Sequence, residues 1–405
     1  MQPPTALLTP AAADRLIGSH MRPLPVESLP LQQCAGAILR EDVHAERDQP
    51  PFDRVAMDGV ALDSRAVREG LRRFRVQGIQ AAGDAPSTLA NRAHCIEIMT
   101  GAVLARGCDA VVPVERITRH GDEVELEAAL TVEAWQNVHR RGSDAREGAR
   151  LLASGTRLRA PEIAVAASAG KARLHVAAQP SIVVMSTGNE LIEPGEAILP
   201  HQVRRSNAHG LAAQLRLHAF ARVADDHVAD DAAAMRHSLR LQIDTHDVII
   251  LSGGVSAGRF DLVPQVLAEL GVQPHFHKVA QRPGKPLWFG TAPSGAAVFG
   301  LPGNPVSSLV CLARYVVPAL RAAAGGLADP VATVALAAPV RVTPPLTCFL
   351  PVRLVPDGAG GLAAEPRPTN GSGDFTSLTG TDGFVELPPG PREYAQGFVT
   401  PCYRW

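Results

Sequence analysis

The chain has 405 residues, a length that predicts about two to four domains at roughly 100 to 200 residues per domain. Its 39 Lys and Arg side chains balance 40 Asp and Glu side chains, so we expect neither nucleic acid nor a membrane surface as a partner. The six cysteines lie far apart without a C-x-x-C pair, which argues against a zinc ribbon or a dense disulfide framework and favours a reducing compartment.

The first half of the chain is rich in turn residues. Residues 1–20 lack the charged start and apolar body of a secretory signal. No run approaches the roughly 18 consecutive apolar residues of a membrane span, so we expect a soluble cytoplasmic protein. Residues 26–140 mix short β-like runs with turns and predict a β-rich, irregular domain. A helix over 161–169, stopped by Gly170, and a strand over 172–176 are expected next.

Residues 181–325 alternate apolar runs with helical patterns. Continuous apolar runs at 182–185, 248–251 and 297–299 predict strands that helices cover on both faces. This alternation is typical of a doubly wound α/β domain. We expect the helices of this domain to be capped or opened by Asn207, Asp230, Asp261 and Pro305, the last of these leading into a helix over 306–324.

Residues 327–405 show no long helical period and predict a small all-β domain. The chain therefore belongs to the multidomain α/β class. It contains no G-x-S-x-G elbow and no H-E-x-x-H motif, which removes the common hydrolase and zinc protease interpretations.

A glycine-rich sequence, SGGVSAG at 252–258, follows one predicted strand and precedes the helix expected at Asp261. Ligands bind at the carboxyl ends of strands in open α/β sheets, and paired glycines let consecutive backbone N–H groups turn toward an anion. The motif therefore indicates a phosphate-bearing ligand, or else a turn that only connects strand to helix. It is not a P-loop, because G-x-x-x-x-G-K-[ST] is absent.

A basic sequence, KVAQRPGKP at 278–286, has Arg282 and Lys285 between two prolines that fix the backbone. Both cations could be held toward one anion, or the segment could be a solvated basic loop. The sequence LPGNP at 301–305 then ends a strand and enters a helix N-terminus, which favours an anion. A rigid strand-to-helix turn explains the same residues.

Four carboxylates stand at comparable turns: Asp58, Glu190, Asp226 and Asp261. Carboxylates beside an anion site are costly unless a cation lies between them, and Mg²⁺ bound by carboxylates and substrate phosphates satisfies both. Ordinary caps, turns and solvated loops explain each of the four singly. His275 and His277 would share a strand face, but with no obvious third ligand they are more often surface residues than a metal site.

Taken together, these motifs resemble the molybdopterin molybdenumtransferase family, the molybdenum insertases that include the E domain of gephyrin. The resemblance covers nearly the whole chain in order. It rests on FD at 52–53, AMDG at 56–59, IMTGA at 98–102, DAVVPVE at 109–115, RGSD at 141–144, STGNEL at 186–191, the glycine-rich sequence, PGKP at 283–286 and LPGNP at 301–305.

The resemblance implies four domains and a homodimer. These domains are an elongated two-segment linker domain (1–25 and 145–178), an inserted β-rich domain (26–144), an α/β domain that binds molybdopterin (179–326) and a C-terminal β-barrel-like domain (327–405). It also implies a reaction in which adenylylated molybdopterin and molybdate give the molybdenum cofactor and AMP with Mg²⁺. The related adenylyltransferase and a gephyrin-like scaffold are the alternatives, and other proteins of cofactor biosynthesis are possible partners.

The family's site residues map onto this sequence by motif. The resemblance implies catalytic roles for Asp58, Glu190, Asp226, Asp261, Lys278 and Lys285, with Mg²⁺ held by Glu190, Asp226 and Asp261. It implies substrate contacts from Thr100, Arg141, Asp144, Ser252, Gly253, Gly254, Ser256, Arg282, Pro302, Pro305, Arg353 and Ser372. One departure is Pro351, which stands where the family has an arginine, with Arg353 two residues further on.

Overall fold

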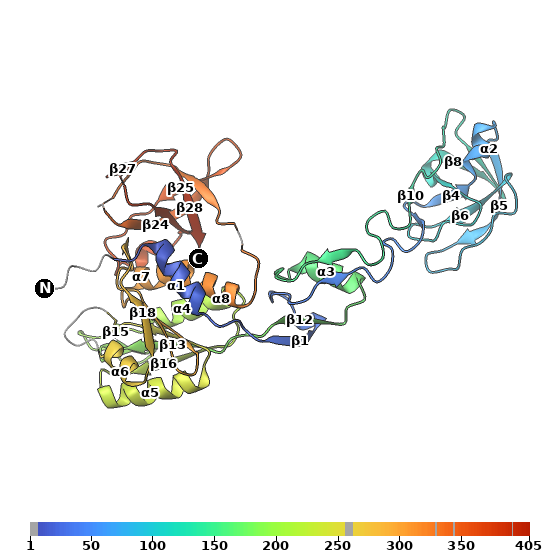
Figure 1. The fold of residues 1–405 in the computed structure, drawn as a ribbon. Coiled ribbons are helices and arrows are strands. Elements are labelled where there is room, and N and C mark those ends of the chain that lie inside the picture. Colours follow the sequence, from blue (N-terminus) through green and yellow to red (C-terminus); the bar gives the residue numbers. More distant parts are fainter. Residues whose placement is uncertain (1–6, 256–261, 329, 343–344, 391) are drawn as a thin grey trace. The chain divides into compact units, whose positions relative to one another are not determined.

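A computed structural model describes residues 7–255, 262–328, 330–342, 345–390 and 392–405 (Figure 1). Its internal contacts divide the chain into two compact units. Unit 1 comprises residues 1–40, 155–159 and 174–405, and unit 2 comprises 41–154 and 160–173. The four expected domains are a finer division than these two units, and their bounds stay a prediction.

The centre of unit 1 is a six-stranded sheet in the order β16-β13-β17-β21-β20-β18. Its first four strands run parallel, whereas β20 and β18 are antiparallel to their neighbours. The expected strands are confirmed, each extended by one or two residues. The strands are β13 (Ile182–Thr187), β16 (Val223–Val228), β17 (Val248–Ser252), β18 (Gln273–His277), β20 (Trp288–Thr291) and β21 (Ala297–Leu301).

Helices cover both faces of this sheet, which is why β13 and β17 are buried along their whole length. One face packs against α1, α4, α7 and α8, and the other packs against α5 and α6. The doubly wound prediction is therefore confirmed. The helices are α1 (Pro10–His20), α4 (Ser206–Leu217), α5 (Ala232–Thr245), α6 (Val263–Glu269), α7 (Pro305–Cys311) and α8 (Val317–Ala323).

Two of the predicted helix caps are wrong. Helix α4 begins one residue before Asn207, whose side chain bonds elsewhere. Helix α5 is capped by Asp231, which accepts from the N–H groups of Ala233 and Ala234. Asp230 instead donates its own N–H to Asn189. Adjacent Asp residues are equally good caps, so sequence alone does not choose between them. Asp261 lies outside the described residues.

The long helix opened by Pro305 is confirmed but is not a regular α-helix. A π-helical turn at Leu312–Val316 joins α7 to α8. Pro318 follows this turn, and proline removes the N–H donor that a regular helix needs there and crowds the preceding turn. The segment Pro305–Ala323 is long and apolar enough to span a membrane, but 78% of its apolar window is buried within the protein. It is a core helix of unit 1.

The C-terminal segment forms a closed barrel, as expected. Its strand order is β19-β24-β25-β22-β28-β26, and a further pairing of β24 with β26 closes the ring. Phe349 and Phe384 of the barrel pack against Val306 and Val310 of α7, which joins barrel and sheet domain in one core. The strands are β19 (Gln281–Arg282), β22 (Thr333–Leu336), β24 (Thr347–Pro356), β25 (Leu362–Pro366), β26 (Gly383–Leu387) and β28 (Val399–Arg404), with β23 (Val340–Arg341) paired to β27 (Glu393–Tyr394) beside them.

The remaining short strands of unit 1 form two pairs. Strand β1 (Val26–Pro30) pairs with β12 (Arg173–Ala177), and β14 (Leu191–Ile192) pairs with β15 (Val203–Arg204). Residues 26–30 therefore pair with a strand that the sequence assigned to the linker domain. Short 3-10 turns lie at Leu31–Gln33 and Thr376–Leu378, and another lies in unit 2 at Val114–Arg116.

Unit 2 is β-rich, as expected, and its main sheet has the order β7-β4-β6-β5-β9-β8. Its core is formed by residues on both faces of this sheet. The strands are β2 (Val43–His44), β3 (Arg54–Val55), β4 (Gly59–Leu62), β5 (Arg73–Gln80), β6 (His94–Ile98), β7 (Ala110–Pro113), β8 (Ile117–His120), β9 (Glu123–Leu126), β10 (Val138–His139) and β11 (Arg150–Leu152), and the helices are α2 (Ser64–Arg68) and α3 (Ala160–Ser168).

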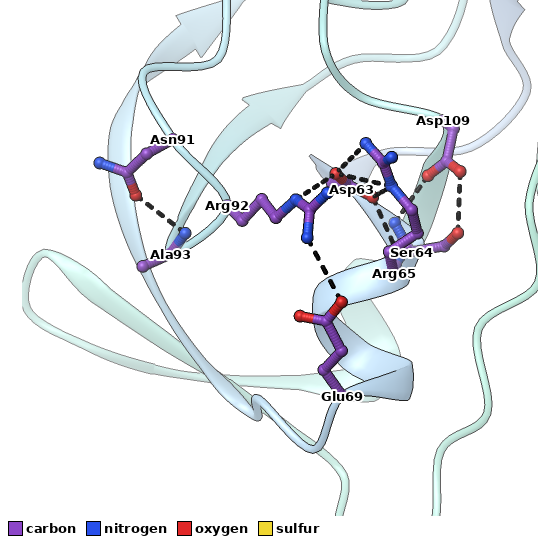
Figure 2. Close-up of polar contacts among 8 residues, drawn as sticks. All are labelled: Asp63, Ser64, Arg65, Glu69, Asn91, Arg92, Ala93 and Asp109. Atoms are coloured by element: carbon purple, nitrogen blue, oxygen red, sulfur yellow. Dashed lines mark hydrogen bonds and ion pairs between the residues drawn. The ribbon is translucent and has the colours of Figure 1, made fainter.

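Buried Asp63 anchors the start of α2 in unit 2 (Figure 2). Its carboxylate accepts from the Arg65 N–H at 3.0 Å and pairs with the guanidinium groups of Arg65 and Arg92, at 2.7 and 3.3 Å. The hydrogen bond from Arg65 holds the pKa of Asp63 below its ordinary value. A buried carboxylate is tolerated when paired in this way, so this cluster stabilises the fold.

Candidate functional site

The sheet of unit 1 has a switch point between β13 and β17. From β13 the chain passes through α4 to β16 on one side, whereas β17 has β21 on its other side. The parallel register aligns Ser186 with Ser252, and Ser252 with Leu301, at the carboxyl ends of three strands. Ligands of open α/β sheets bind outside the carboxyl ends at such a point. We call the residues around Ser186, Ser252, Gly253 and Gly254 the switch-point crevice.

Glycine is required at positions 253 and 254. Both have left-handed backbone angles, with φ of +99° and +68°. A Cβ on Gly254 would lie 2.6 Å from Val263 Cγ2 and 2.9 Å from Thr187 Oγ1. The expectation of two consecutive N–H groups facing an anion is only partly met, because the Gly253 N–H donates to the Leu301 carbonyl at 3.2 Å. Ser256 lies outside the described residues.

Asn207 joins the glycine motif to the LPGNP turn. Its Nδ2 donates to Ser252 Oγ at 3.0 Å and to the Gly303 carbonyl at 2.8 Å. The sequence placed this residue at a helix start and therefore missed the bridging role. The available signal was its polar side chain in the first turn of a helix that follows a buried strand.

Two buried polar atoms at the crevice have no hydrogen-bond partner within the described part of the chain. They are Ser186 Oγ, in a side chain that is only 2% exposed, and Asn207 Oδ1. Leaving a buried polar group unpaired costs about 1 to 3 kcal/mol. Because each atom can accept a hydrogen bond, the crevice fits a ligand with polar groups.

A separate cavity of about 900 Å³ lies between the sheet domain and the barrel, and we call it the basic cleft. Its charged lining residues are Arg282, Lys285 and Arg341, and no Asp or Glu belongs to its described lining. A cleft whose described lining carries three cations and no carboxylate suits an anion. Arg341 was not predicted; on the surface it pairs with Glu393 at 3.0 Å.

The basic loop, residues 278–286, is fixed by contacts with two other segments. The Ala280 N–H donates to the Leu8 carbonyl at 2.7 Å, and the Ala280 carbonyl accepts from the Thr347 N–H at 3.0 Å. The Val279 N–H closes the loop on the Lys285 carbonyl at 2.9 Å. Arg282 and Lys285 are exposed on this fixed frame. The backbone of the loop is therefore fixed, and whether its two exposed cations hold one anion stays a prediction.

The LPGNP turn and the barrel form another wall of the basic cleft. Asn304 Nδ2 donates to Ser372 Oγ at 2.8 Å, and the Val306 N–H donates to the Ser372 carbonyl at 3.1 Å. Pro302 and Ser372 line the cleft as expected. Pro305 does not, because it is the first residue of α7 and lies behind the turn.

Asp226 does not stand after a strand as expected. It lies inside β16, aligned with Met185, two residues before the strand ends. Its Oδ2 accepts from Ser238 Oγ at 2.7 Å and from Gln242 Nε2 at 2.9 Å, both on α5. These bonds tie an edge strand to a helix, so the carboxylate faces α5 instead of the crevice.

The expected metal set is therefore not assembled from described residues. Glu190 is exposed just beyond β13, with its carboxylate folded against Gly188. No group of three His, Cys, Asp or Glu side chains within the described ranges could hold a metal ion, and Asp261 is not in those ranges. His275 and His277 bond instead to Thr291 Oγ1 and to the Val255 carbonyl.

Two predicted basic residues lie outside the basic cleft. Lys278 does not line it, and its backbone N–H donates to the Leu287 carbonyl. Arg353 lines a neighbouring cavity of about 440 Å³ that meets the basic cleft at Pro368. There it faces Glu365 at 3.6 Å. Pro351 lines the basic cleft itself, so shifting the arginine by two residues along β24 removes it from that cavity.

Unit 2 holds the other predicted polar residues. Asp58 Oδ1 accepts from both the N–H and the hydroxyl of Thr100 at 2.7 Å, and these bonds lower the Asp58 pKa. Asp58 lines a cavity of about 330 Å³ with Glu97 and Arg119. The Asp58 carboxylate is therefore ionised and accessible to solvent, and Thr100 holds it in place.

Arg141 and Asp144 are also in unit 2, at another place. Arg141 Nε donates to Asp48 at 2.8 Å, and its N–H donates to Asp53 at 2.9 Å. Asp144 accepts from Ser143 Oγ at 3.1 Å. Neither residue lines the cavity beside Asp58. Their contacts order the segment around β3 and β10.

The fold is that of an α/β protein with a switch point in a parallel sheet, where ligands of such sheets bind, beside a cation-lined cleft under a barrel. The chain belongs to the molybdopterin molybdenumtransferase family, whose members are enzymes of molybdenum cofactor biosynthesis. Three family models match it: the MoeA N-terminal region (domain I and II) at 8–170, the probable molybdopterin binding domain at 183–322 and the MoeA C-terminal region (domain IV) at 333–403.

Named relatives and solved structures support this assignment. The molybdopterin molybdenumtransferase of Synechocystis is 38% identical over 401 residues, covering 98% of this chain and 100% of the relative. That of Synechococcus elongatus is 34% identical, covering 96% of this chain and 98% of the relative. A crystal structure of the MoeA protein of Pyrococcus horikoshii has a TM-score of 0.79 at 28% identity, covering 98% of this chain and 99% of that chain.

Proposed function

We propose that this enzyme inserts molybdate into adenylylated molybdopterin with release of AMP. The carrying observation is the basic cleft, whose charged described lining is Arg282, Lys285 and Arg341. A small tetrahedral dianion such as molybdate suits three cationic side chains, two of them on the fixed backbone of the basic loop. Family membership supplies the reaction class, and the cleft is consistent with its anionic substrate.

The larger substrate would occupy the switch-point crevice. Gly253 and Gly254 shape this crevice, because a Cβ at either position would meet Thr187 and force the turn to move. Ser186 Oγ and Asn207 Oδ1 are acceptors that a pterin N–H group can satisfy. Gly303 lies next to Gly253, because a Cβ on Gly303 would be 3.5 Å from the Gly253 Cα. This contact brings the crevice up to the turn that lines the basic cleft.

Mg²⁺ is proposed to bind through Glu190 and the substrate phosphates. Mg²⁺ usually takes one or two protein carboxylates and keeps water or phosphate in its other positions, and the exposed Glu190 fits such a role. When bound, the ion would neutralise phosphate charge. Asp226 is omitted because α5 uses its carboxylate. We expect Glu190→Gln to raise the Mg²⁺ concentration needed for half-maximal AMP release, whereas Asp226→Asn should leave it unchanged.

In this proposal, side chains of the protein orient the oxyanion and contact the substrate. Lys285 and Arg282 orient the oxyanion by charge-assisted hydrogen bonds, and Asn304 holds Ser372 at the opposite wall. Asp58 stays ionised because Thr100 donates two hydrogen bonds to it. An ionised carboxylate can accept a hydrogen bond from a substrate N–H or O–H group, and Asp58→Asn tests that role directly.

A homodimer and a cytoplasmic location complete the proposal. All six cysteines are free thiols, five of them buried, as expected in a reducing compartment. Sedimentation of the purified chain near twice its 42.7 kDa mass would support the dimer, and a monomer at micromolar concentration would contradict it.

The decisive experiment supplies purified enzyme with adenylylated molybdopterin, molybdate and Mg²⁺. We expect AMP and a molybdenum-loaded pterin to appear together. An adenylyltransferase would instead consume ATP with metal-free molybdopterin, and a scaffold without catalysis would form neither product. Omission of molybdate separates insertion from simple hydrolysis of the pyrophosphate bond.

A further inference from the structure

Beneath the exposed cations of the basic loop lies a buried polar chain. The Gln281 side chain has no exposed surface, and its Nε2 donates to the Gly284 carbonyl at 3.1 Å. Tyr315, which is 1% exposed, donates its hydroxyl to Gln281 Oε1. These hydrogen bonds therefore connect Tyr315 of the core helix to the turn between Arg282 and Lys285.

The turn is packed tightly against this chain. Gly284 has φ of +91°, and a Cβ there would lie 2.6 Å from Cys311 Sγ and 2.7 Å from Gln281 Nε2. Gln281 thus fills the inside of the loop while Arg282, the next residue along β19, is exposed. Any shift of the Gln281 side chain must therefore move the Gly284 peptide, and with it the backbone of Lys285.

The π-helical turn sets the position of Tyr315. Residues Leu312–Val316 form this turn, and π turns inside α-helices frequently occur at functional sites. The preceding residue, Arg314, pairs with Asp14 of α1 at 2.9 Å and with Glu386 of the barrel at 2.8 Å. Glu386 is the register partner of Phe349, which lines the basic cleft. The same turn therefore bonds directly to Gln281 of the cleft lining and to Glu386, which stands beside the lining residue Phe349.

We propose that Gln281 and Tyr315 are positioning residues that hold Arg282 and Lys285 in the geometry that binds the oxyanion. This inference rests on the proposed function, in which that oxyanion is molybdate. Two apolar side chains would fill the same volume without the free-energy cost of burying polar groups, which is large unless those groups are fully hydrogen-bonded. Both polar atoms of the Gln281 amide have a hydrogen-bond partner. A buried polar network that is satisfied in this way specifies one arrangement of the loop.

The test uses Tyr315→Phe, Gln281→Leu and the double variant. Tyr315→Phe leaves Gln281 Oε1 without its donor, and Gln281→Leu removes the side-chain bond to Gly284. We expect each to weaken molybdate binding about three- to tenfold by titration calorimetry. In the assay, the KM for molybdate should rise while kcat at saturating molybdate stays near its original value.

The double variant separates positioning from stability. Replacing both partners by apolar groups of similar shape is nearly neutral for folding, so its thermal stability should recover relative to Tyr315→Phe. Its molybdate affinity should stay weak, because the bond to Gly284 is still missing. Recovery of affinity along with stability would overturn the inference.

Two further variants complete the design. Gln80→Leu is the matched control, since Gln80 is a 2% exposed glutamine of unit 2 whose Nε2 donates to the Val103 carbonyl. It should lose stability without losing molybdate affinity. Lys285→Ala tests the proposed function itself: unchanged molybdate binding in that variant would reject the site. Loss in Lys285→Ala but not in the double variant would reject only the positioning role.

Discussion

The switch-point crevice and the basic cleft are built in opposite ways. The crevice comes from residues at the ends of neighbouring strands, where the parallel register aligns Ser186 with Ser252 and Gly253 follows directly. The basic cleft draws its lining from segments near 282, 303, 341 and 372, which belong to the sheet domain and the barrel. The comparison teaches that one site is fixed by backbone geometry and the other by side-chain packing between domains.

The largest expected effect breaks the backbone-built site. Gly254→Val puts a β-branched side chain at a φ of +68°, where its Cβ would lie 2.6 Å from Val263 Cγ2. We expect binding of adenylylated molybdopterin to fall by more than about a hundredfold, together with a lower melting temperature. Calorimetry with the pterin ligand measures this, and excess molybdate should give no rescue. Near-normal pterin affinity would show that the crevice is not its site.

The next effect concerns the packing-built site. Lys285→Ala removes one charge-assisted contact, worth about 1.5 to 3 kcal/mol or about ten- to a hundredfold in molybdate affinity. Raising the molybdate concentration should restore turnover. Arg353→Ala is the matched control, because Arg353 lines the neighbouring cavity and should change molybdate affinity by less than about threefold. If Lys285→Ala weakens pterin binding instead, the two sites are not divided as proposed.

A smaller effect is expected where the two sites meet. Asn207→Ala removes the donors to Ser252 Oγ and the Gly303 carbonyl, each worth about 1 kcal/mol. We expect about five- to thirtyfold weaker pterin binding and a smaller loss for molybdate. Binding of both ligands is measured by calorimetry on the same preparation. Equal losses for the two ligands would mean that Asn207 supports the whole edge of the sheet and not the crevice in particular.

The smallest effect sharpens the contrast with unit 2, where Asp58 depends on Thr100 alone. Thr100→Val removes the hydroxyl bond but keeps the backbone bond, so the Asp58 pKa should rise toward its ordinary value of about 3.9. A depressed carboxyl pKa contributes stability above the unfolded pKa, and this is lost as pH falls through the folded pKa. The variant should therefore show a slightly weaker loss of stability with acid, checked by NMR titration of the Asp58 carboxyl carbon. An unchanged Asp58 pKa would assign the depression to the backbone N–H.

The amino-acid sequence alone predicts the doubly wound sheet, which the structure confirms, and the segments that form the two candidate sites. Runs such as 182–185 and 248–251 must be buried strands because they have no polar face, and helices must then cover both sides. The glycines at 253 and 254 have the left-handed angles that a strand-to-helix turn beside a ligand requires. The bracketed cations Arg282 and Lys285 line one cavity, as their rigid spacing indicated.

Only the tertiary structure decided which polar side chains share a site. Neither Asp226 nor Asn207 has its expected contacts: the carboxylate joins a strand to α5, and the supposed helix cap bridges two turns. Arg353 lines the cavity next to the one that Lys285 lines. The pairing of β24 with β25 places it there, and the sequence does not show that pairing. Local sequence patterns predict the backbone because the conformational preferences of each residue restrict the backbone at that position. Side-chain partners distant in sequence depend on packing, which no local pattern contains.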